Sequence, residues 1–140
     1  MKVLVDTNVV LNVLLKHADF YMDSFAVFQL SDSGNVNGVL AAVSLTNIFY
    51  ILRKTGKSSE EVYQDMDDIC GIFTAASVSE TTISNALALR WKDFEDAVQF
   101  ITAKESNVDF IITWNKADYE ASDVPCKTPT EFITYLKENE

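Results

Sequence analysis

The chain has 140 residues, 48% hydrophobic and 23% charged, enough to bury the core of one globular domain, and we expect a single domain over residues 1–140. Eleven Lys and Arg residues stand against 21 Asp and Glu residues, which gives a formal net charge of −10. Such a chain is a poor non-specific binder of nucleic acid, because phosphate contacts need Lys and Arg. Action on nucleic acid would therefore require a bound cation, a local basic patch or a basic partner.

The cysteines and the opening segment both favour a cytoplasmic protein. Cys70 and Cys126 lie far apart in the sequence and form no metal-type pair. The opening apolar run ends at Asp6 and is too short for a secretory signal. No run of about 18 apolar residues is present to span a membrane. We therefore expect a cytoplasmic protein with reduced thiols.

Strand and helix patterns alternate along the chain, which predicts an α/β fold, a three-layer α/β/α sandwich with a mostly parallel central sheet. Four short apolar runs are the expected strands, at residues 3–5, 39–43, 77–79 and 109–113. The expected helices cover residues 9–15, 19–31, 48–56, 58–73, 81–91 and 93–105, with a last helix beginning near 128. Two capping boxes, Ser58 with Glu61 and Thr128 with Glu131, support the start of two of these helices.

Asp6 directly follows the first expected strand. In open parallel sheets, ligands lie in the crevice outside the carboxyl ends of the strands, so a carboxylate at this place is a candidate metal ligand. The alternative is an N-cap for the next helix, since Asp is among the best N-capping residues. We favour the ligand, with Thr7 and Asn8 either orienting the carboxylate or satisfying backbone groups at the turn.

A second acidic segment opens the helix expected at residues 93–105. Asp93 and Asp96 are three residues apart and share one helical face. Taken alone, the pair is better explained by helix capping, since the helix dipole favours acids in the first turn. If Asp6 lies beside them, the same carboxylates form a site of oxygen ligands, which suits Mg²⁺ or Mn²⁺.

Polar residues also follow two other expected strands. Thr113, Asn115 and Asp118 come after the last strand, where a hydroxyl, an amide and a carboxylate would hold a metal-bound water or a phosphate. A strand-to-helix turn explains these three residues equally well. Asn47 follows the second strand, and taken alone it is better explained by helix capping.

Composition and motifs exclude several other chemistries. His17 is the only histidine, which excludes a ribonuclease mechanism with two histidines, and nothing supports a Cys–His pair. The Gly-x-Ser-x-Gly, Walker A and Gly-x-Gly-x-x-Gly motifs are absent. Histidine and cysteine are too few for a zinc site.

Several segments resemble the PIN-domain family, and the resemblance covers nearly the whole chain. Three of them are similar to acid-bearing segments of the family: VLVDTNVVL (Val3–Leu11), DFEDAVQ (Asp93–Gln99) and FIITWNKADY (Phe110–Tyr119). Two more resemble one PIN subgroup: LTNIFYILRK (Leu45–Lys54) and TPTEFI (Thr128–Ile133). On this resemblance, Asp6 is the family's first acid and Asp96 its third.

The resemblance implies a Rossmann-like fold and a metal-dependent ribonuclease. Asp6 and Asp96 would then hold Mg²⁺ or Mn²⁺, and the metal would activate water and neutralise charge on the scissile phosphate of RNA. Many relatives are toxins of bacterial toxin–antitoxin pairs, commonly dimeric and neutralised by a small protein partner. The resemblance therefore also implies an antitoxin and a homodimer as partners.

The chain departs from the family's pattern at two of the usual acids. The second acid falls at Asn47 and the fourth at Asn115, and each replacement removes one negative charge from the site. An Asn carbonyl coordinates a metal more weakly than a carboxylate does. Asp93 and Asp118 are expected to compensate, since each lies three residues from an aligned position. The resembling subgroup shares the two Asn residues.

Our first hypothesis is a Mg²⁺- or Mn²⁺-dependent endoribonuclease of the PIN type. Its core ligands are Asp6 and Asp96, and the assisting residues are Asp93, Asp118, Thr113, Asn115 and Asn47. The densest basic patch closes the third expected helix and would contact the RNA backbone, although a solvated helix end explains it as well: Arg53, Lys54 and Lys57.

Two other classes of protein remain as alternatives. The first is a non-catalytic PIN-like module that binds protein or RNA through a degenerate site, favoured by the missing acids and the net charge. The second is a receiver-like phosphotransfer domain, in which an Asp at a strand end is phosphorylated. Asp6 stands alone after the first strand, where such domains have paired acids, so we disfavour this class.

Overall fold

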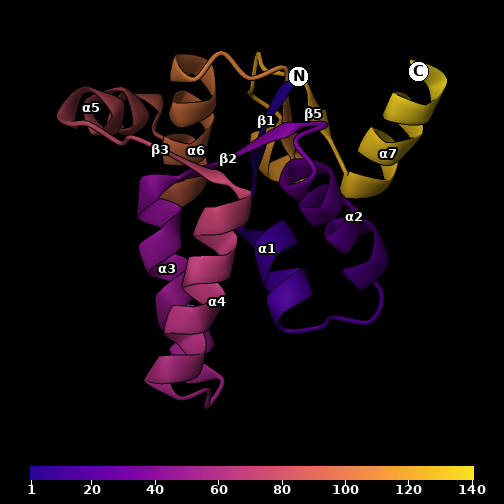
Figure 1. Ribbon diagram of the computed structural model, residues 1–140. Helices are drawn as coiled ribbons and strands as arrows, with labels where there is room; N and C mark the ends of the chain where they lie inside the picture. Colours follow the sequence, from indigo (N-terminus) through magenta and orange to yellow (C-terminus); the bar gives the residue numbers. More distant parts are fainter.

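Five strands form the centre of the fold in a computed structural model that describes all residues, 1–140 (Figure 1). The strands are β1 (Lys2–Val5), β2 (Asn37–Ala41), β3 (Thr74–Ala76), β4 (Phe110–Ile112) and β5 (Cys126–Lys127). The helices are α1 (Thr7–Leu14), α2 (Tyr21–Asp32), α3 (Ala42–Lys54), α4 (Ser59–Ile72), α5 (Glu80–Leu89), α6 (Phe94–Glu105) and α7 (Pro129–Glu138), with a short 3₁₀ helix η1 (Lys116–Tyr119).

All four strand pairings are parallel, in the order β3-β2-β1-β4-β5. Side chains alternate between the two faces of the sheet, as the pleat requires. Val3 and Val5 of β1 join a core built with α1, α2, α3, α4 and α7, whereas Leu4 joins a second core built with α5 and α6. Figure 1 shows α5 and α6 at the upper left of the sheet and α3 and α4 below them. The predicted α/β/α sandwich with a parallel sheet is confirmed.

The centre of the sheet is the place where the strand order reverses. After β1 the chain builds outward through β2 and β3, and it then returns to place β4 on the other side of β1. Val5 pairs with Ile112, so the carboxyl ends of β1 and β4 lie side by side. Parallel α/β sheets bind ligands at such a reversal, and Asp6 and Thr113 are the residues that emerge there.

Helix starts follow the capping signals in the sequence. Ser58 accepts from the backbone N–H of Glu61 at the start of α4, and Thr128 accepts from the backbone N–H of Glu131 at the start of α7. Pro129 occupies the first turn of α7, where its missing N–H would have had no partner in the helix. Both predicted capping boxes are confirmed.

The third expected strand was wrong in position. We expected it at residues 77–79, but β3 is Thr74–Ala76, where Val39 of β2 pairs with Thr74. Ser79 instead accepts from the backbone N–H of Thr82 and caps α5. A serine three residues before a hydroxyl-bearing residue is a capping signal, and it outweighs the weak strand propensity of the segment.

Two further boundaries differ from the prediction. The strand expected to reach Val43 ends at Ala41, and α3 begins at Ala42 without a side-chain cap, so Asn47 lies inside the helix and the capping role expected for it is wrong. The edge strand β5 was missed, because its two residues give no apolar run. The 3₁₀ helix η1 was missed as well, and it places Tyr119 in the core.

No helix has the length and apolar content needed to cross a membrane.

Candidate functional site

Asp6 is a buried carboxylate at the junction of β1 and α1, with 5% of its surface exposed. It serves as the N-cap of α1, since its side chain accepts from the backbone N–H of Asn8 at 3.5 Å. Capping therefore occurs at Asp6, but one long hydrogen bond does not explain the burial of a charged group. The other partners of the carboxylate come from distant parts of the chain.

Three side chains far away in sequence donate hydrogen bonds to Asp6. Thr113, just after β4, donates from Oγ1 to Oδ2 at 2.9 Å. Gln99 of α6 donates from Nε2 to Oδ1 at 3.2 Å, and Tyr119 of η1 donates from its hydroxyl to Oδ2 at 3.1 Å. The Asn8 amide adds a longer contact to Oδ2 at 3.4 Å. Charge-assisted hydrogen bonds of this kind stabilise a buried carboxylate that water no longer solvates.

Asp96 lies in the first turn of α6 and is linked to Asp6 through the Tyr119 hydroxyl. The Tyr119 hydroxyl is 3.1 Å from Oδ2 of Asp6 and 3.4 Å from Oδ1 of Asp96. Asp93 is the N-cap of α6, where its Oδ1 accepts from the backbone N–H of Asp96 at 3.0 Å. Asp93 thus has the capping role that its position alone suggested, and its exposed carboxylate lines the same pocket as Asp96.

Burial raises the pKa values of three acids in this region, and neighbouring negative charges add to the shift at two of them, Asp96 and Glu95. Burial, together with the negative charges of Asp6, Asp93, Asp118 and Glu95, raises the pKa of Asp96 to about 7. Burial also raises the pKa of Asp6, although its hydrogen bonds act in the opposite direction. The pKa of Glu95 is raised by burial and by the charge of Asp6. Asp96 and Glu95 are therefore exposed to repulsion from neighbouring carboxylates in addition to the cost of burial.

Glu95 is a member of the site that sequence reasoning missed. Its carboxylate accepts from the Asn47 amide of α3 at 2.6 Å and from the Thr7 hydroxyl at 2.9 Å. Asn47, at the aligned position of a family acid, thus makes a short contact with an acid on another helix. The sequence did carry a signal, because Glu95 lies one residue from Asp96 in the same acidic segment, but the choice among Asp93, Glu95 and Asp96 needed tertiary structure.

Asn115 stands in a similar relation to Asp118. Its side-chain amide donates to Oδ2 of Asp118 at 2.7 Å within η1 and the turn before it. The backbone N–H of Asn115 donates to the Thr113 hydroxyl at 3.0 Å. Each of the two Asn residues is therefore hydrogen-bonded to a nearby carboxylate, Glu95 for Asn47 and Asp118 for Asn115.

Gln99 and Tyr119 were also missed by the sequence analysis, although both fall within segments that resemble the family. Gln99 is fully buried and donates to Asp6 and to the Tyr119 hydroxyl, while its Oε1 has no hydrogen-bond partner. Tyr119 is 2% exposed, and burial raises the pKa of its hydroxyl far above the ordinary value, so the hydroxyl keeps its proton. Only the packing of α6 against β1 brings Gln99 next to Asp6, so its role could not be read from the sequence.

A pocket of about 620 Å³ opens beside Asp96. Its lining includes four acids and one cation: Asp93, Asp96, Asp118, Glu120 and Lys92. Glu95 and Asn47 line a second, more apolar pocket of about 410 Å³, which also includes the exposed rings of Tyr50 and Phe94.

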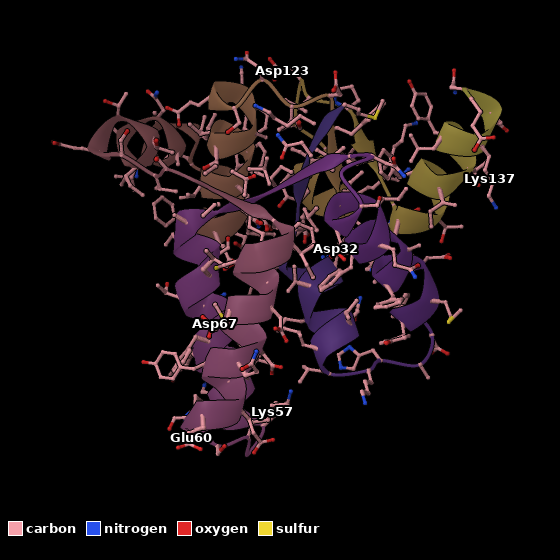
Figure 2. All side chains as sticks on the ribbon, viewed as in Figure 1. Asp32, Lys57, Glu60, Asp67, Asp123 and Lys137 are labelled. Carbon is pink, nitrogen blue, oxygen red and sulfur yellow. The ribbon has the colours of Figure 1, made fainter.

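The expected basic patch lies at the far end of α3 from the acids. Figure 2 shows Lys57 at the tip of the α3–α4 hairpin, remote from the sheet. Lys57 pairs with Asp65 at 2.8 Å, and Arg53 donates to the Lys57 carbonyl at 2.7 Å. Lys54 lies over the ring of Tyr50, 4.5 Å from its centroid. These cations are therefore engaged locally, and the structure does not bring them to the acidic site.

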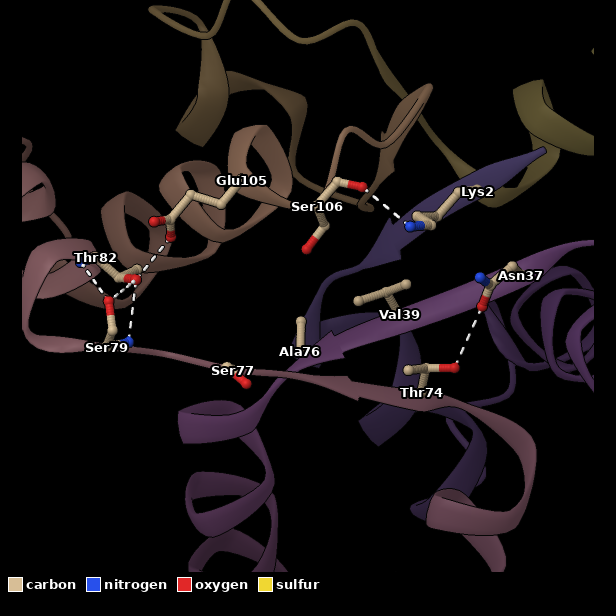
Figure 3. Close-up of a pocket in the computed structure, with 10 residues that line it drawn as sticks. All are labelled: Lys2, Asn37, Val39, Thr74, Ala76, Ser77, Ser79, Thr82, Glu105 and Ser106. Carbon is tan, nitrogen blue, oxygen red and sulfur yellow. Dashed lines mark hydrogen bonds between the residues drawn. The ribbon is translucent and has the colours of Figure 1, made fainter.

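A second polar pocket, of about 360 Å³, begins at the opposite end of the sheet (Figure 3). Its lining includes the first residues of β1, β2 and β3, which are Lys2, Asn37 and Thr74. Glu105 of α6 is its one acid, and that carboxylate accepts from Thr82 at 2.7 Å. This pocket therefore offers hydroxyl groups and one charge of each sign, without a pair of acids.

The donor set at Asp6 fits a hard divalent cation better than any other metal. No three His, Cys, Asp or Glu side chains lie in an arrangement that would hold a metal by themselves. Mg²⁺ commonly takes one or two carboxylates and completes its shell with water and substrate phosphate. Asp6 and Asp96 supply two carboxylates; burial raises the pKa of both, and at Asp96 neighbouring carboxylates add repulsion that a cation would relieve.

Comparison with known proteins agrees with the geometry. The PIN domain family model matches residues 2–117. The chain is 22% identical over 136 residues to ribonuclease VapC1 of Aquifex aeolicus (strain VF5), which covers 94% of this chain and 92% of that protein.

Two solved structures share the fold at low sequence identity. One is VapBC2 from Rickettsia felis bound to a DNA fragment from their promoter, at TM-score 0.70 and 16% identity over 91% of this chain and 98% of that one. The other is a toxin–antitoxin complex from Klebsiella pneumoniae, at TM-score 0.66 and 16% identity over 91% and 97% of the two chains. Because the family model matches most of the sequence, the chain belongs to the PIN domain family.

Proposed function

We propose that this chain is a divalent-metal-dependent endoribonuclease of the PIN type, formed as one domain over residues 1–140. The observation that carries the proposal is the pair of acids, Asp6 and Asp96, joined by Tyr119 beside the carboxyl ends of β1 and β4. The similarity to ribonuclease VapC1 supports RNA as the substrate.

In this proposal Asp6 and Asp96 hold Mg²⁺ or Mn²⁺. Such a cation supplies Lewis-acid activation of water and neutralises charge that builds on the scissile phosphate. Thr113 holds the Asp6 carboxylate through its 2.9 Å hydrogen bond. Asp118 lines the pocket beside Asp96 and accepts from Asn115, which places a carboxylate where it can orient a water or a ribose hydroxyl.

A toxin role is supported by the same comparisons. The similar structure from Klebsiella pneumoniae is a toxin–antitoxin complex, so we propose a small antitoxin protein as a partner of this chain. The net charge of −10 favours a partner with basic side chains near the acidic site. A homodimer and a cytoplasmic location are proposed by analogy with the family.

The test is RNA cleavage by the purified full-length protein with Mn²⁺ or Mg²⁺, with and without a chelator, over several structured and unstructured RNAs. We expect metal-dependent cleavage that Asp6→Asn lowers by at least about 100-fold, because the substitution removes a charge from the metal and phosphate site. The matched control is Asp67→Asn, an exposed acid on α4 labelled in Figure 2, which should cleave as the wild type does. Cleavage that survives both the chelator and Asp6→Asn would contradict the proposal.

A non-catalytic binding module is the second candidate. Asn47 and Asn115 favour it, because each occupies the aligned place of an acid and directs its amide at a neighbouring carboxylate. Saturable binding of RNA or of a partner protein by a folded preparation that cleaves no RNA would support this candidate over the nuclease.

A further inference from the structure

We propose that Tyr119 is a positioning residue for the Asp6–Asp96 pair, and that Gln99 holds Tyr119 and Asp6 in place for this role. The inference rests on the proposed metal site and adds two neutral side chains to it. Neither side chain would be a metal ligand. They would set how tightly the two acids bind the cation, by fixing where the carboxylates lie before it arrives.

Hydrogen-bond contacts link Tyr119 and Gln99 to each other and to the two acids. The Tyr119 hydroxyl lies 3.1 Å from Oδ2 of Asp6, 3.4 Å from Oδ1 of Asp96 and 3.1 Å from Nε2 of Gln99. The same Gln99 nitrogen is 3.2 Å from Oδ1 of Asp6. Gln99 and Tyr119 therefore contact different oxygens of the Asp6 carboxylate, and together they fix its rotation.

The available protons are too few to give both acids a donor from Tyr119. The Gln99 amide has two hydrogens, one for Asp6 and one for the Tyr119 oxygen. The Tyr119 hydroxyl has one proton, so it can donate to Asp6 or to Asp96 but not to both at once. Oδ2 of Asp6 keeps the Thr113 hydroxyl in either case, whereas Oδ1 of Asp96 has no side-chain donor when the Tyr119 proton goes to Asp6. A cation that contacts both acids satisfies this oxygen, which gives the arrangement a reason to bind one.

A purely structural role does not account for the hydroxyl. Tyr119 is 2% exposed, and its ring packs edge-on against Trp91 with centroids 6.2 Å apart. A phenylalanine would fill the same space without placing a polar group in the core, where it must find a partner. The partners that the hydroxyl does find are the two carboxylates of the site and the amide that holds one of them.

The inference also bears on the two Asn residues. Asn47 and Asn115 leave the site with fewer carboxylates to attract a metal than the family pattern has. Rigid placement of the remaining pair lowers the cost of bringing two like charges onto one cation. Groups that orient metal ligands in this way typically change affinity by 10–100-fold when they are removed.

The experiment is calorimetric titration of Mn²⁺ into the full chain, with Tyr119→Phe and Gln99→Met compared with the wild type. Both substitutions keep side-chain volume and remove only the polar atoms. We expect the dissociation constant to rise by roughly 10–100-fold in each. Tyr63→Phe is the matched control, since this exposed tyrosine on α4 is remote from the acids and should leave the constant unchanged. An unchanged or tighter constant in Tyr119→Phe overturns the inference.

A second measurement needs no metal. Thermal unfolding with a chelator is compared for Asp6→Asn, Tyr119→Phe and the double variant. If the hydroxyl and the carboxylate act as a pair, the two shifts in Tm are not additive, and the second substitution costs less in the presence of the first. Additive shifts overturn the inference whatever the titration gives.

The two measurements separate failure of the inference from failure of the proposed function. Wild-type protein that neither binds Mn²⁺ nor cleaves RNA overturns the nuclease proposal and the metal role of Tyr119 together. Wild-type protein that binds Mn²⁺ and cleaves RNA, with Tyr119→Phe indistinguishable from it in both assays, overturns the inference alone.

Discussion

The two ends of the sheet carry polar pockets of opposite character. At the amino end, Lys2 donates to the Ser106 carbonyl at 3.2 Å and Glu105 accepts from Thr82, so each charge has a local partner (Figure 3). At the carboxyl end, the pocket beside Asp96 is lined by four acids and a single lysine. Uncompensated charge on rigid elements marks a functional site more clearly than the presence of a pocket does.

The largest difference between the two ends is expected for matched threonines. Thr113 donates to the buried Asp6 carboxylate at 2.9 Å, whereas Thr74 donates to the exposed Asn37 side chain at 3.3 Å. Thr113→Val should lower metal-dependent RNA cleavage by roughly 10–100-fold, because the carboxylate loses its shortest hydrogen bond. Thr74→Val should leave the rate unchanged. Equal effects of the two substitutions would remove the functional distinction between the ends.

Adding one negative charge at each end sharpens the comparison. Asn47→Asp places a second carboxylate against Glu95, so we expect Mn²⁺ affinity to rise by about tenfold, since charge count tunes affinity. In the absence of metal, the same variant should melt at a lower temperature. Asn37→Asp adds the same charge at the amino end and should not alter Mn²⁺ binding. Calorimetry and thermal melts measure both effects, and tighter Mn²⁺ binding by Asn37→Asp would contradict the assignment.

The pH dependence of stability should come from the carboxyl end. The pKa of Asp96 rises from 3.8 to about 7 on folding, so between these values the folded state binds more protons than the unfolded state. The contribution of Asp96 to the stability of the metal-free protein is therefore greatest at low pH and falls as pH rises toward 7. Asp6 and Glu95 shift in the same direction.

Melting temperatures from pH 4 to 8, in the presence of a chelator, measure this slope. Asp96→Asn should flatten it, and saturating Mn²⁺ should raise the melting temperature most at the upper end of the range. Glu105→Gln, at the amino end, is the control and should keep the wild-type slope. A slope that is the same in Asp96→Asn and in the wild type would show that other groups dominate.

The smallest effect is expected for Lys2→Ala. The Lys2 ammonium makes one hydrogen bond to a backbone carbonyl near the surface, so its loss should cost about 0.5–1.5 kcal/mol of unfolding free energy. RNA cleavage should not change. Denaturant unfolding measures the first quantity, and a large loss of cleavage in this variant would place a functional role at the amino end.

Much of the fold could be predicted from local patterns in the sequence. The apolar run before Asp6 and the capping boxes at Ser58 and Thr128 are short-range signals, and they appear in the structure where the sequence predicts them. β3 and β5 could not be placed in this way, because strands of two or three residues depend on pairing with β2 and β4 rather than on their own side chains.

The functional site likewise contains some residues that the sequence identifies and others that it does not. Asp6 and Asp96 are readable as candidates, because one follows a buried strand and the other opens a helix in a family-like segment. Glu95, Gln99 and Tyr119 are not, since each gains its role from a partner that is between 20 and 113 residues away. The position of Asp118 relative to Asp96 also depends on how η1 packs against α6.

The sequence by itself determined the class of the fold, placed Asp6 at the end of a buried strand and excluded chemistries that need a second histidine. These properties follow from hydrophobic periodicity and from residue types, which are local. Tertiary structure decided which acid meets Asn47, which hydroxyl joins Asp6 to Asp96, and that the basic residues at the end of α3 lie away from both. Hydrogen-bond geometry across the sheet and its helices is non-local, so no pattern along the chain encodes it directly.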